Sequence, residues 1–363
     1  MKGNLIRAYS ATNLGDDLFI KILCDRYPRQ KFYIIADKKH SKPFETISNL
    51  KVINPVSFID KIILKLGFNF TSYNILSKKI AKKNDSVVHI GGSIFMQNSN
   101  WSNRVKEYDK LIKSSNNFFV LGSNFGPYQD HLYFEKYNNL FKNINDICFR
   151  DNHSYSKFQS LDNVRKAPDI VFALDSDKII DYKLNNYFVI SVINLENRKE
   201  LKEYQKLYEQ AIIDISKQLI DRGKKVVLMS FCEREGDEVA IKRIKKQYSH
   251  EKLKAYFYKG NMPEALSVIK SSEGVVATRF HSMILALLFD KPFFPFIYSN
   301  KTLNVIEDLE YDNYYLNISQ TQNIDINKIV DQLTNGIFYN LSEIKDEANK
   351  QFLKLDEFYL NNI

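Results

Sequence analysis

The sequence predicts an α/β protein built from two Rossmann-like domains, and three observations support this class. Several segments are continuously apolar, as expected of strands in a parallel sheet that helices cover on both faces. Segments with a helical pattern alternate with these strands, which is typical of βαβ units. The length of 363 residues is more than one hydrophobic core usually supports. We therefore expect two domains of ordinary size.

The first domain is predicted over residues 1–175 and begins with a strand over residues 5–9. This strand leads into a polar loop that contains Asn13, Gly15 and Asp16. The loop after the first strand is the usual ligand edge of a doubly wound sheet, so these residues are candidate substrate contacts. The alternative is that they only turn the chain and cap the following helix.

A basic helical region is predicted over residues 57–83 of this domain. Its amphipathic part, residues 59–66, is either an ordinary domain helix or a contact with a membrane face. Further apolar strands are expected at residues 32–36, 51–53 and 86–90, and from residues 118 and 147 onward.

The later strands of the first domain end in residues suited to ligand contact. Gly91, Gly92 and Ser93 follow one strand, Asn124 follows the next, and Arg150 follows a third. The glycines allow the backbone to come close to a ligand, and the absence of a Lys-Ser or Lys-Thr pair argues against a P-loop. Since the carboxyl ends of parallel strands meet at one edge, we expect these residues to share a crevice.

A polar linker over residues 176–186 separates this domain from a second one over residues 187–340, and a C-terminal helix follows over 341–363. Two βα units of similar size describe a GT-B-like architecture, in which two Rossmann-like domains face a central cleft. The second domain is predicted to contain strands at 187–193, 225–231, 254–258, 274–277 and 314–318, and helices at 200–222, 237–248, 262–271, 283–289, 301–309 and 326–333.

The composition narrows the class of ligand. Hydrophobic residues make up 44% and charged residues 26%, which predicts an ordered globular chain. The net charge of +9 is compatible with nucleic acid, an acidic membrane surface or an anionic substrate. The lysines are spread along predicted helices, as on solvated faces, so nucleic-acid binding is disfavoured. Three cysteines without metal spacing and no segment of membrane-spanning length predict a soluble cytoplasmic protein without a metal site.

The most informative stretch is the turn between the strand at 274–277 and the helix that follows it. Arg279 and His281 lie on this turn, where unpaired helix N–H groups favour an anion. Arg279 offers a planar fork of donors, His281 a titratable proton, and Lys301 a third cation after the next strand. A small, multiply charged anion is therefore the favoured ligand. The plainer alternative is a solvated helix start whose Phe280 packs inward.

Seven short motifs occur in an order that resembles the polysaccharide pyruvyl transferase family, from residue 13 to about residue 301. The ordered set is more specific than any one motif. The motifs are Asn13-x-Gly15-Asp16, Gly91-Gly92, Gly122-x-x-x-Gly126-Pro127, Arg150-Asp151-x-x-Ser154, Pro168-Asp169, Arg279-x-His281 and Tyr298-x-x-Lys301.

The resemblance implies transfer of the enolpyruvyl carbons of phosphoenolpyruvate to two sugar hydroxyls as a cyclic ketal. It implies that Arg279, His281 and Lys301 are catalytic. Beyond the resemblance, we expect Asp16 to orient or deprotonate the sugar hydroxyl. The resemblance also implies a set of substrate-binding residues, namely Arg150, Phe280 through its backbone amide, Asn13, Gly15, Gly91, Gly92, Ser93 and Asn124. Guanidinium groups fit the phosphate and the carboxylate of phosphoenolpyruvate, which agrees with these roles.

The implied pathway is the biosynthesis of bacterial capsule, exopolysaccharide or cell-wall polysaccharide. Phosphoenolpyruvate is then the donor substrate, no separate cofactor or metal is expected, and the acceptor is a sugar or a lipid-linked oligosaccharide. A lipid-linked acceptor would place the protein at the inner face of the membrane as a peripheral protein. The acceptor sugar, its hydroxyl pair and the oligomeric state stay open.

The chain departs from the family pattern at two places. Ser93 stands where the family often has a third glycine, and residues 231–237 form a more charged loop than usual, expected to lie apart from the anion cluster. Two alternatives remain. A nucleotide-sugar glycosyltransferase of the same fold commonly has an acidic residue on the helix at 283–289, and this helix has none. A non-catalytic polysaccharide-binding or anion-binding protein would not need a histidine beside arginines.

Overall fold

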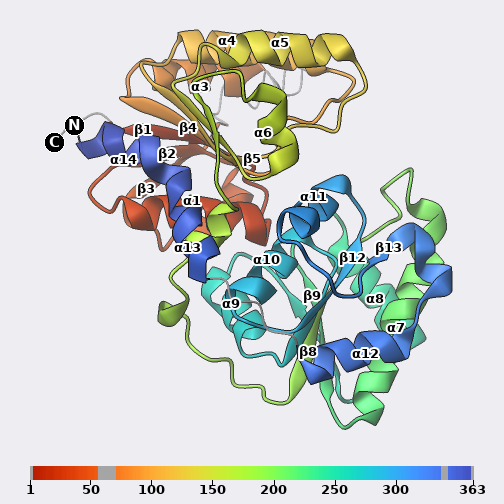
Figure 1. Cartoon of the computed structure of the whole chain (residues 1–363). Helices are drawn as coiled ribbons and strands as arrows, with labels where there is room; N and C mark the ends of the chain where they lie inside the picture. Colours follow the sequence, from red (N-terminus) through yellow and green to blue (C-terminus); the bar gives the residue numbers. More distant parts are fainter. Residues whose placement is uncertain (1–2, 56–70, 337–341, 361–363) are drawn as a thin grey trace. The chain divides into compact units, whose positions relative to one another are not determined.

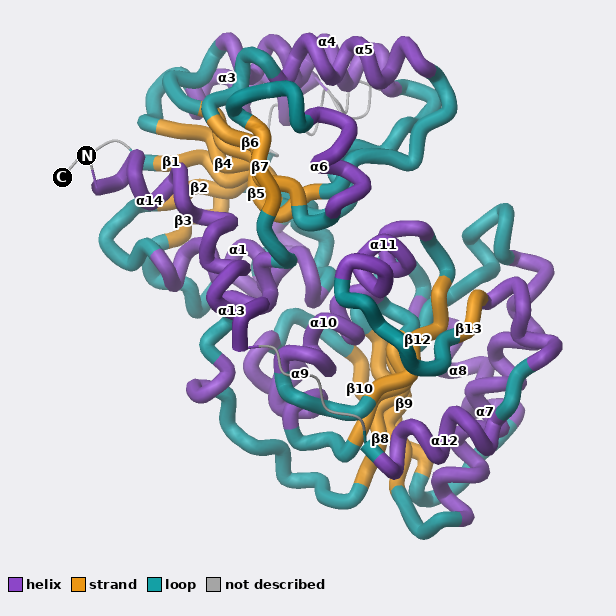
Figure 2. The backbone as a smooth tube through the Cα atoms, viewed as in Figure 1, coloured by secondary structure: helices purple, strands orange, loops and turns teal. Residues whose placement is uncertain are grey.

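The computed structural model describes residues 3–55, 71–336 and 342–360, which form two compact units. The first unit comprises Met1–Ser10, Asp16–Ala173 and Ile344–Ile363. The second comprises Ala11–Gly15 and Leu174–Glu343. Each unit contains one parallel sheet with helices connecting its strands (Figures 1 and 2).

The first unit is organised around a seven-stranded parallel sheet with the order β3-β2-β1-β4-β5-β6-β7. Central strands such as β4 and β5 are buried along their whole length, because helices cover both faces. The strands are β1 (Asn4–Arg7), β2 (Phe32–Ile35), β3 (Leu50–Ile53), β4 (Ser86–Ile90), β5 (Phe118–Ser123), β6 (Asp146–Phe149) and β7 (Val164–Lys166).

Helices α3, α4 and α5 cover one face of this sheet, and α1, α13 and α14 lie on the opposite side (Figure 1). The C-terminal helices are held in place partly by Gln351, whose side chain accepts a hydrogen bond from the Gly122 amide at 2.9 Å and donates to the Ala167 carbonyl at 2.7 Å. The helices are α1 (Leu14–Arg26), α3 (Thr71–Ala81), α4 (Trp101–Lys113), α5 (His131–Phe141), α6 (Asn152–Phe158), α13 (Ser342–Asn349) and α14 (Leu353–Leu360).

The second unit has a six-stranded parallel sheet with the order β10-β9-β8-β11-β12-β13. Its strands are β8 (Tyr187–Ser191), β9 (Lys225–Ser230), β10 (Leu253–Phe257), β11 (Gly274–Ala277), β12 (Phe293–Ile297) and β13 (Leu316–Asn317). Its helices are α7 (Gln205–Asp221), α8 (Asp237–Gln247), α9 (Met262–Lys270), α10 (Phe280–Leu288), α11 (Asn300–Asp308) and α12 (Ile326–Asn335).

Both sheets reverse their strand order at a single point, between β1 and β4 in the first unit and between β8 and β11 in the second. This is the strand order of dinucleotide-binding Rossmann folds, in which ligands bind beyond the carboxyl ends of the strands at the reversal. In the second unit, Arg279 lies in the loop after β11 and His281 in the first turn of α10. In the first unit, Asp16 lies in the first turn of α1, which follows β1, and the glycine pair follows β4.

Most predicted strands and helices are present with ends shifted by a few residues, and three details differ. The predicted C-terminal helix is two α-helices separated by a 3₁₀ turn at Lys350–Phe352. The predicted helix at 200–222 begins with a 3₁₀ turn at Lys202–Tyr204. Helices α4 and α5 and the short strand β7 were not predicted from the sequence. The amphipathic segment 59–66 lies outside the described residues.

Candidate functional site

The turn between β11 and α10 is fixed by two serine hydroxyls. The Ser191 hydroxyl, at the end of β8, accepts hydrogen bonds from the Thr278 amide at 2.8 Å and the Arg279 amide at 3.1 Å. The Ser282 hydroxyl, in the first turn of α10, donates to the Arg279 carbonyl at 2.6 Å. Because β8 and β11 are adjacent strands, the turn is held from both sides.

Two carboxylates surround the Arg279 side chain, which is buried. Its Nε donates to Asp237 Oδ2 at 3.1 Å, its Nη2 also donates to Asp237, and its Nη1 donates to Glu235 Oε2 at 2.5 Å. Asp237 Oδ2 additionally accepts from the backbone amides of Phe231 and Cys232 at 3.0 and 2.9 Å. The positive charge of Arg279 is therefore matched by neighbouring carboxylates.

These contacts correct one expectation from the sequence. The charged loop at residues 231–237 was expected to lie apart from the anion cluster, and this is wrong. The loop follows β9, which is separated from β11 only by β8, so the long Arg279 side chain reaches Glu235 and Asp237. The acidic residues that depart from the family pattern thus contact Arg279, at the turn between β11 and α10, directly.

A basic group lies beside this ion pair in the second unit. The Lys301 Nζ is 5.8 Å from the centre of the Phe280 ring and 5.7 Å from that of Tyr298. The Arg198 guanidinium lies 4.9 Å from the Tyr298 ring and forms an ion pair with Glu235 at 2.7 Å. Among the described residues, no carboxylate forms an ion pair with Lys301.

These cations affect Tyr298 itself. Burial alone would raise the pKa of its hydroxyl, but the charges of Lys301, Arg279 and Arg198 outweigh burial and bring this pKa below its usual value. The local field thus favours negative charge at this place in spite of the two carboxylates. Sequence reasoning did not select Tyr298 or Arg198 as site residues, although Tyr298 belongs to one of the quoted motifs.

His281 packs against residues that belong to the first polar loop of the chain. In the second unit, Asn13 forms an isolated bridge with Cys232, and its side-chain oxygen accepts from the Gly15 amide at 3.2 Å. A Cβ atom added at Gly15 would lie 1.8 Å from His281 Nδ1, so only glycine fits against this imidazole. The His281 ring also meets the buried Phe280 ring edge to face, with 5.1 Å between the ring centres. The structure therefore brings Asn13, Gly15, Phe280 and His281 together.

A second set of predicted residues gathers around Arg150 in the first unit. The Arg150 side chain is buried, and it donates to Asp169 at 2.8 Å and to the Asn124 amide oxygen at 3.0 Å. A Cβ atom added at Gly92 would lie 2.7 Å from the guanidinium, so glycine makes room for it. The Ser93 hydroxyl donates to the same Asn124 oxygen at 3.3 Å. Asp169, the partner of Arg150, was quoted in a motif but not selected as a site residue.

Gly91 and Asp16 complete the predicted set in the first unit. Gly91 has a φ of +151°, a conformation that side chains rarely adopt. A Cβ atom added there would lie 3.9 Å from Asp16 Oδ1, in the first turn of α1. Thus the glycine pair lies between the guanidinium of Arg150 and the carboxylate of Asp16.

Burial also affects two of the cysteine thiols. Burial raises the pKa of the Cys148 and Cys232 thiols to about 12, so they are protonated at neutral pH and unsuited to nucleophilic catalysis. No group of three or more His, Cys, Asp or Glu residues in the described part of the chain is placed to hold a metal ion. Within the same residues, no helix has both the length and the apolar character needed to cross a membrane.

Similar solved structures define the fold class. The chain superimposes on a UDP-GlcNAc 2-epimerase from Methanocaldococcus jannaschii with a TM-score of 0.61 and 13% identity, covering 98% of this chain and 100% of that one. An MnaA–UDP co-structure from S. aureus gives a TM-score of 0.62 at 12% identity, covering 100% and 98%. HepE from Anabaena, in complex with UDP and glucose, gives 0.58 at 12%, covering 99% of both chains. These likenesses concern the fold alone, and they confirm the predicted α/β, GT-B-like class.

The family follows from the sequence. The family model described as polysaccharide pyruvyl transferase matches residues 13–300, and the chain belongs to this family. The chain is also 23% identical over 315 residues to the amylovoran biosynthesis protein AmsJ of Erwinia amylovora, covering 72% of this chain and 75% of that protein. The resemblance noted from the motifs is thereby confirmed.

Proposed function

We propose that the protein is a pyruvyl transferase that moves the pyruvyl group of phosphoenolpyruvate onto two hydroxyls of a sugar as a cyclic ketal. The reaction would serve the biosynthesis of a bacterial capsule, exopolysaccharide or cell-wall polysaccharide. The observation that carries the proposal is that His281 and Lys301 both lie beside Phe280: the centre of the Phe280 ring is 5.1 Å from that of the His281 ring and 5.8 Å from Lys301 Nζ. A proton donor and a cation thus lie together at the start of α10.

This arrangement suits the donor because phosphoenolpyruvate carries a phosphate and a carboxylate close together. The first N–H groups of α10 and the ammonium group of Lys301 supply positive potential for these oxyanions. Arg279 has five N–H donors, and the described contacts with Asp237 and Glu235 use three of them. We assign to Arg279 both the positioning of the turn and donor contact through its other N–H groups.

The roles of the first unit concern substrate binding. Arg150 is oriented by Asp169 and Asn124, so its guanidinium is presented in a fixed geometry. We assign to it an oxyanion of the substrate, in line with the preference of guanidinium groups for carboxylate and phosphate. Asp16 is assigned to the acceptor, where a carboxylate can orient a sugar hydroxyl or accept its proton.

The chemistry balances with these groups. His281 gives a proton to the methylene carbon of phosphoenolpyruvate, and one sugar hydroxyl loses its proton as it forms a bond to C2. The bond between C2 and the phosphate oxygen then breaks, with Lys301 compensating the leaving charge. A second hydroxyl closes the ketal at C2. Overall, the two sugar hydroxyls lose two protons. The proton added at the new methyl group balances one of them, and the proton taken up by the released phosphate balances the other.

The test is phosphate release from phosphoenolpyruvate in the presence of galactose, mannose and N-acetylhexosamine acceptors, including lipid-linked forms. Ketal formation is checked by the appearance of a new methyl signal in the NMR spectrum of the acceptor. UDP-, GDP- and CDP-sugars are offered as alternative donors in parallel. Transfer of a sugar from one of them would replace the proposal with a glycosyltransferase, and donor binding without any turnover across the panel would favour a non-catalytic binder.

A further inference from the structure

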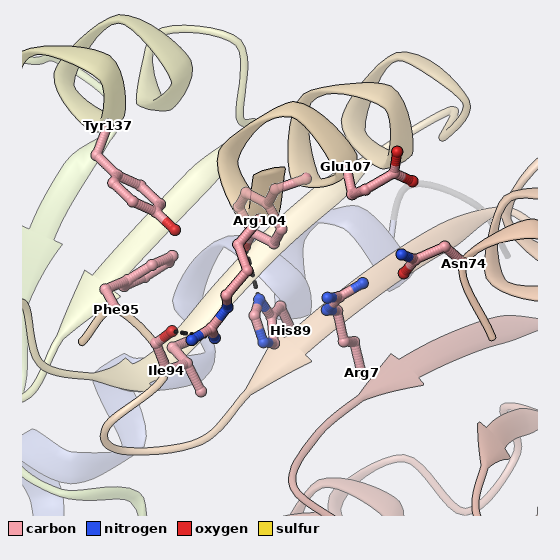
Figure 3. A pocket seen from close by; sticks show the side chains of 9 residues that line it. Arg7, Asn74, His89, Ile94, Phe95, Arg104, Glu107 and Tyr137 are labelled. Atoms are coloured by element: carbon pink, nitrogen blue, oxygen red, sulfur yellow. Dashed lines mark hydrogen bonds between the residues drawn. The ribbon is translucent and has the colours of Figure 1, made fainter. Parts of the chain in front are cut away.

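The first unit contains a small cavity whose lining residues are separate from Asp16 and from the residues around Arg150. It has a volume of about 30 Å³, which is room for roughly two water-sized groups. Its lining comes from the ends of β1 and β4 and from helices α3 and α4, and includes Arg7, Asn74, His89, Arg104 and Tyr108 (Figure 3). Since β1 and β4 flank the reversal of strand order, the cavity lies where ligands bind in this class of sheet.

Two arginines face this cavity from different elements. Arg7 is the last residue of β1, and Arg104 projects from α4 (Figure 3). Within the described part of the chain, neither forms an ion pair: the Arg7 guanidinium lies over the rings of Tyr108 and Tyr73 at 5.6 and 5.9 Å, and Arg104 donates to the Ile94 carbonyl at 3.4 Å. This contrasts with Arg150 and Arg279, whose charges are matched by carboxylates.

The one acidic residue that lines the cavity is engaged elsewhere. The carboxylate of Glu107 forms ion pairs with Lys110 at 2.8 Å and with Lys78 at 3.5 Å. Figure 3 shows this carboxylate turned away from the two guanidinium groups. The cavity thus has an excess of positive charge, with no described carboxylate directed into it.

The remaining polar groups are neutral hydrogen-bonding partners. His89 pairs with Arg7 in the register of β4 and β1, and its Nδ1 is 2.6 Å from the Tyr108 hydroxyl. Burial, together with the charges of Arg7 and Arg104, holds the pKa of His89 well below its usual value, so the ring is neutral. The charged and titratable groups around this ring are Arg7, Arg104, Glu107, Tyr108 and Tyr137.

We propose that this cavity binds an oxyanion, a phosphate or carboxylate group carried by the acceptor substrate. The two half-buried guanidinium groups have no carboxylate partner among the described residues and together favour an anion between them, and the volume admits two oxygens of such a group. Donor-binding residues lie on other loops, so the acceptor is the partner left for this cavity. The oxyanion chemistry stands on the cavity alone, whereas its assignment to the acceptor rests on the proposed function.

The test uses the imidazole of His89 as a local reporter. The full chain is labelled with ¹³C-histidine, and the His89 ring signal, one of six, is assigned by its loss in a His89→Gln variant. Inorganic phosphate and glucuronate are titrated separately at constant ionic strength. We expect a saturable shift of this signal and a rise in the pKa of His89, because a bound anion favours the imidazolium form.

Two variants and one control complete the design. Arg7→Gln and Arg104→Gln should each weaken the anion roughly 10- to 150-fold, the range for loss of a charge-assisted hydrogen bond. Arg29→Gln, which removes an exposed arginine of the same unit, should leave the titration unchanged. The Arg104 variant guards against misfolding of the strand variant, since within the described residues the Arg104 side chain makes one long hydrogen bond, to the Ile94 carbonyl.

The outcomes separate cleanly. A saturable shift with either anion that is weakened in the two variants supports the site, and the tighter anion identifies the chemical group. Absence of a saturable shift with both anions, or a shift that the arginine variants leave unchanged, overturns it. The reporter needs no turnover, so failure of the transferase assay and failure of this site are distinguishable.

Discussion

Replacing Arg279 tests how much its buried ion pair with Asp237 contributes to the stability of the second unit. Its side chain and that of Asp237 are 7% and 0% exposed, and they form a buried ion pair. In Arg279→Met, Asp237 keeps its two backbone hydrogen bonds but loses its cation, while Glu235 keeps Arg198. Breaking a buried pair by removing one partner costs about 3 to 5 kcal/mol. We expect the second unit to lose that amount of unfolding free energy.

The matched control is Lys301→Met, which removes a cation of the same site that has no ion pair among the described residues. Its cost should stay within about 0.5 kcal/mol, as for a surface substitution away from buried partners. The double variant Arg279→Met with Asp237→Asn removes the uncompensated charge as well. We therefore expect the double variant to be more stable than the sum of the single changes predicts.

Urea unfolding must be followed for each unit, because a two-unit chain need not unfold in one step. The single tryptophan, Trp101 on α4, reports the first unit by fluorescence. Hydrogen exchange of peptides from α8 and β11 reports the second. With a slope of about 2 kcal/mol per M urea, the midpoint of the second unit should fall by roughly 1.5 to 2.5 M. Equal midpoints for Arg279→Met and Lys301→Met would refute the structural role of the ion pair.

Four further outcomes are expected. His281→Ala should keep most of the phosphoenolpyruvate binding in a direct titration and lower the single-turnover rate by a factor of roughly 10² to 10⁴. Lys301→Met should instead weaken phosphoenolpyruvate binding. Near-normal turnover in His281→Ala would show that His281 takes no part in the chemistry. Gly15→Ala should displace the imidazole, because the added Cβ would lie 1.8 Å from His281 Nδ1, and so reduce turnover while far-UV circular dichroism stays unchanged. Burial depresses the pKa of His89, so the neutral ring contributes to the stability of the fold at pH values above 6.5, the ordinary pKa of histidine. As the pH falls below 6.5, this stability is lost at about 1.4 kcal/mol per pH unit. His89→Gln should flatten that slope in oxyanion-free buffer. Titration followed by absorbance at 295 nm should show one tyrosine that ionises before the others, and this early ionisation should be absent in Tyr298→Phe. The ionised Tyr298 stabilises the fold at pH values above 10.0, the ordinary pKa of tyrosine, and this stabilisation is lost as the pH falls through the lowered pKa.

The parallel sheets could be predicted because their strands are buried on both faces. β4 and β5 are short apolar runs without alternation, and runs of this length favour strands that are covered on both faces. The loop residues Gly92, Asn124 and Arg150 were expected together on the same ground, and the structure brings them together. Local sequence was sufficient here because strand ends in a parallel sheet converge on one edge.

Helices α4 and α5 were missed although their periodicity is present. In α5 the buried residues Tyr133, Tyr137 and Phe141 recur every four positions. Aromatic residues have only moderate helix propensity, and asparagine and lysine surround them, so the local signal for a helix is weak. Tertiary packing of these rings against the sheet, rather than propensity, makes the segment helical.

The carboxylate partners of Arg150 and Arg279 could not be predicted from the sequence, for a different reason. Asp237 lies 42 positions before Arg279, and Asp169 lies 19 positions after Arg150. An aspartate at the start of a helix predicts favourable interaction with the helix dipole and nothing about a distant arginine. Only the strand order, which brings the loop after β9 near that after β11, determines this pairing.

Arg150 in the first unit and Arg279 in the second are thus matched in the same way, and this bears on turnover. Arg150 and Arg279 each face a buried aspartate, so each offers directed hydrogen bonds with little net charge. Phosphoenolpyruvate and the released phosphate are both multiply charged anions, and a site with several unmatched cations would hold the product as firmly as the substrate. Such uniform binding does not accelerate the chemical step. Under the proposed function, matched arginines orient the anions, while Lys301 and the start of α10 act where charge develops on the leaving phosphate.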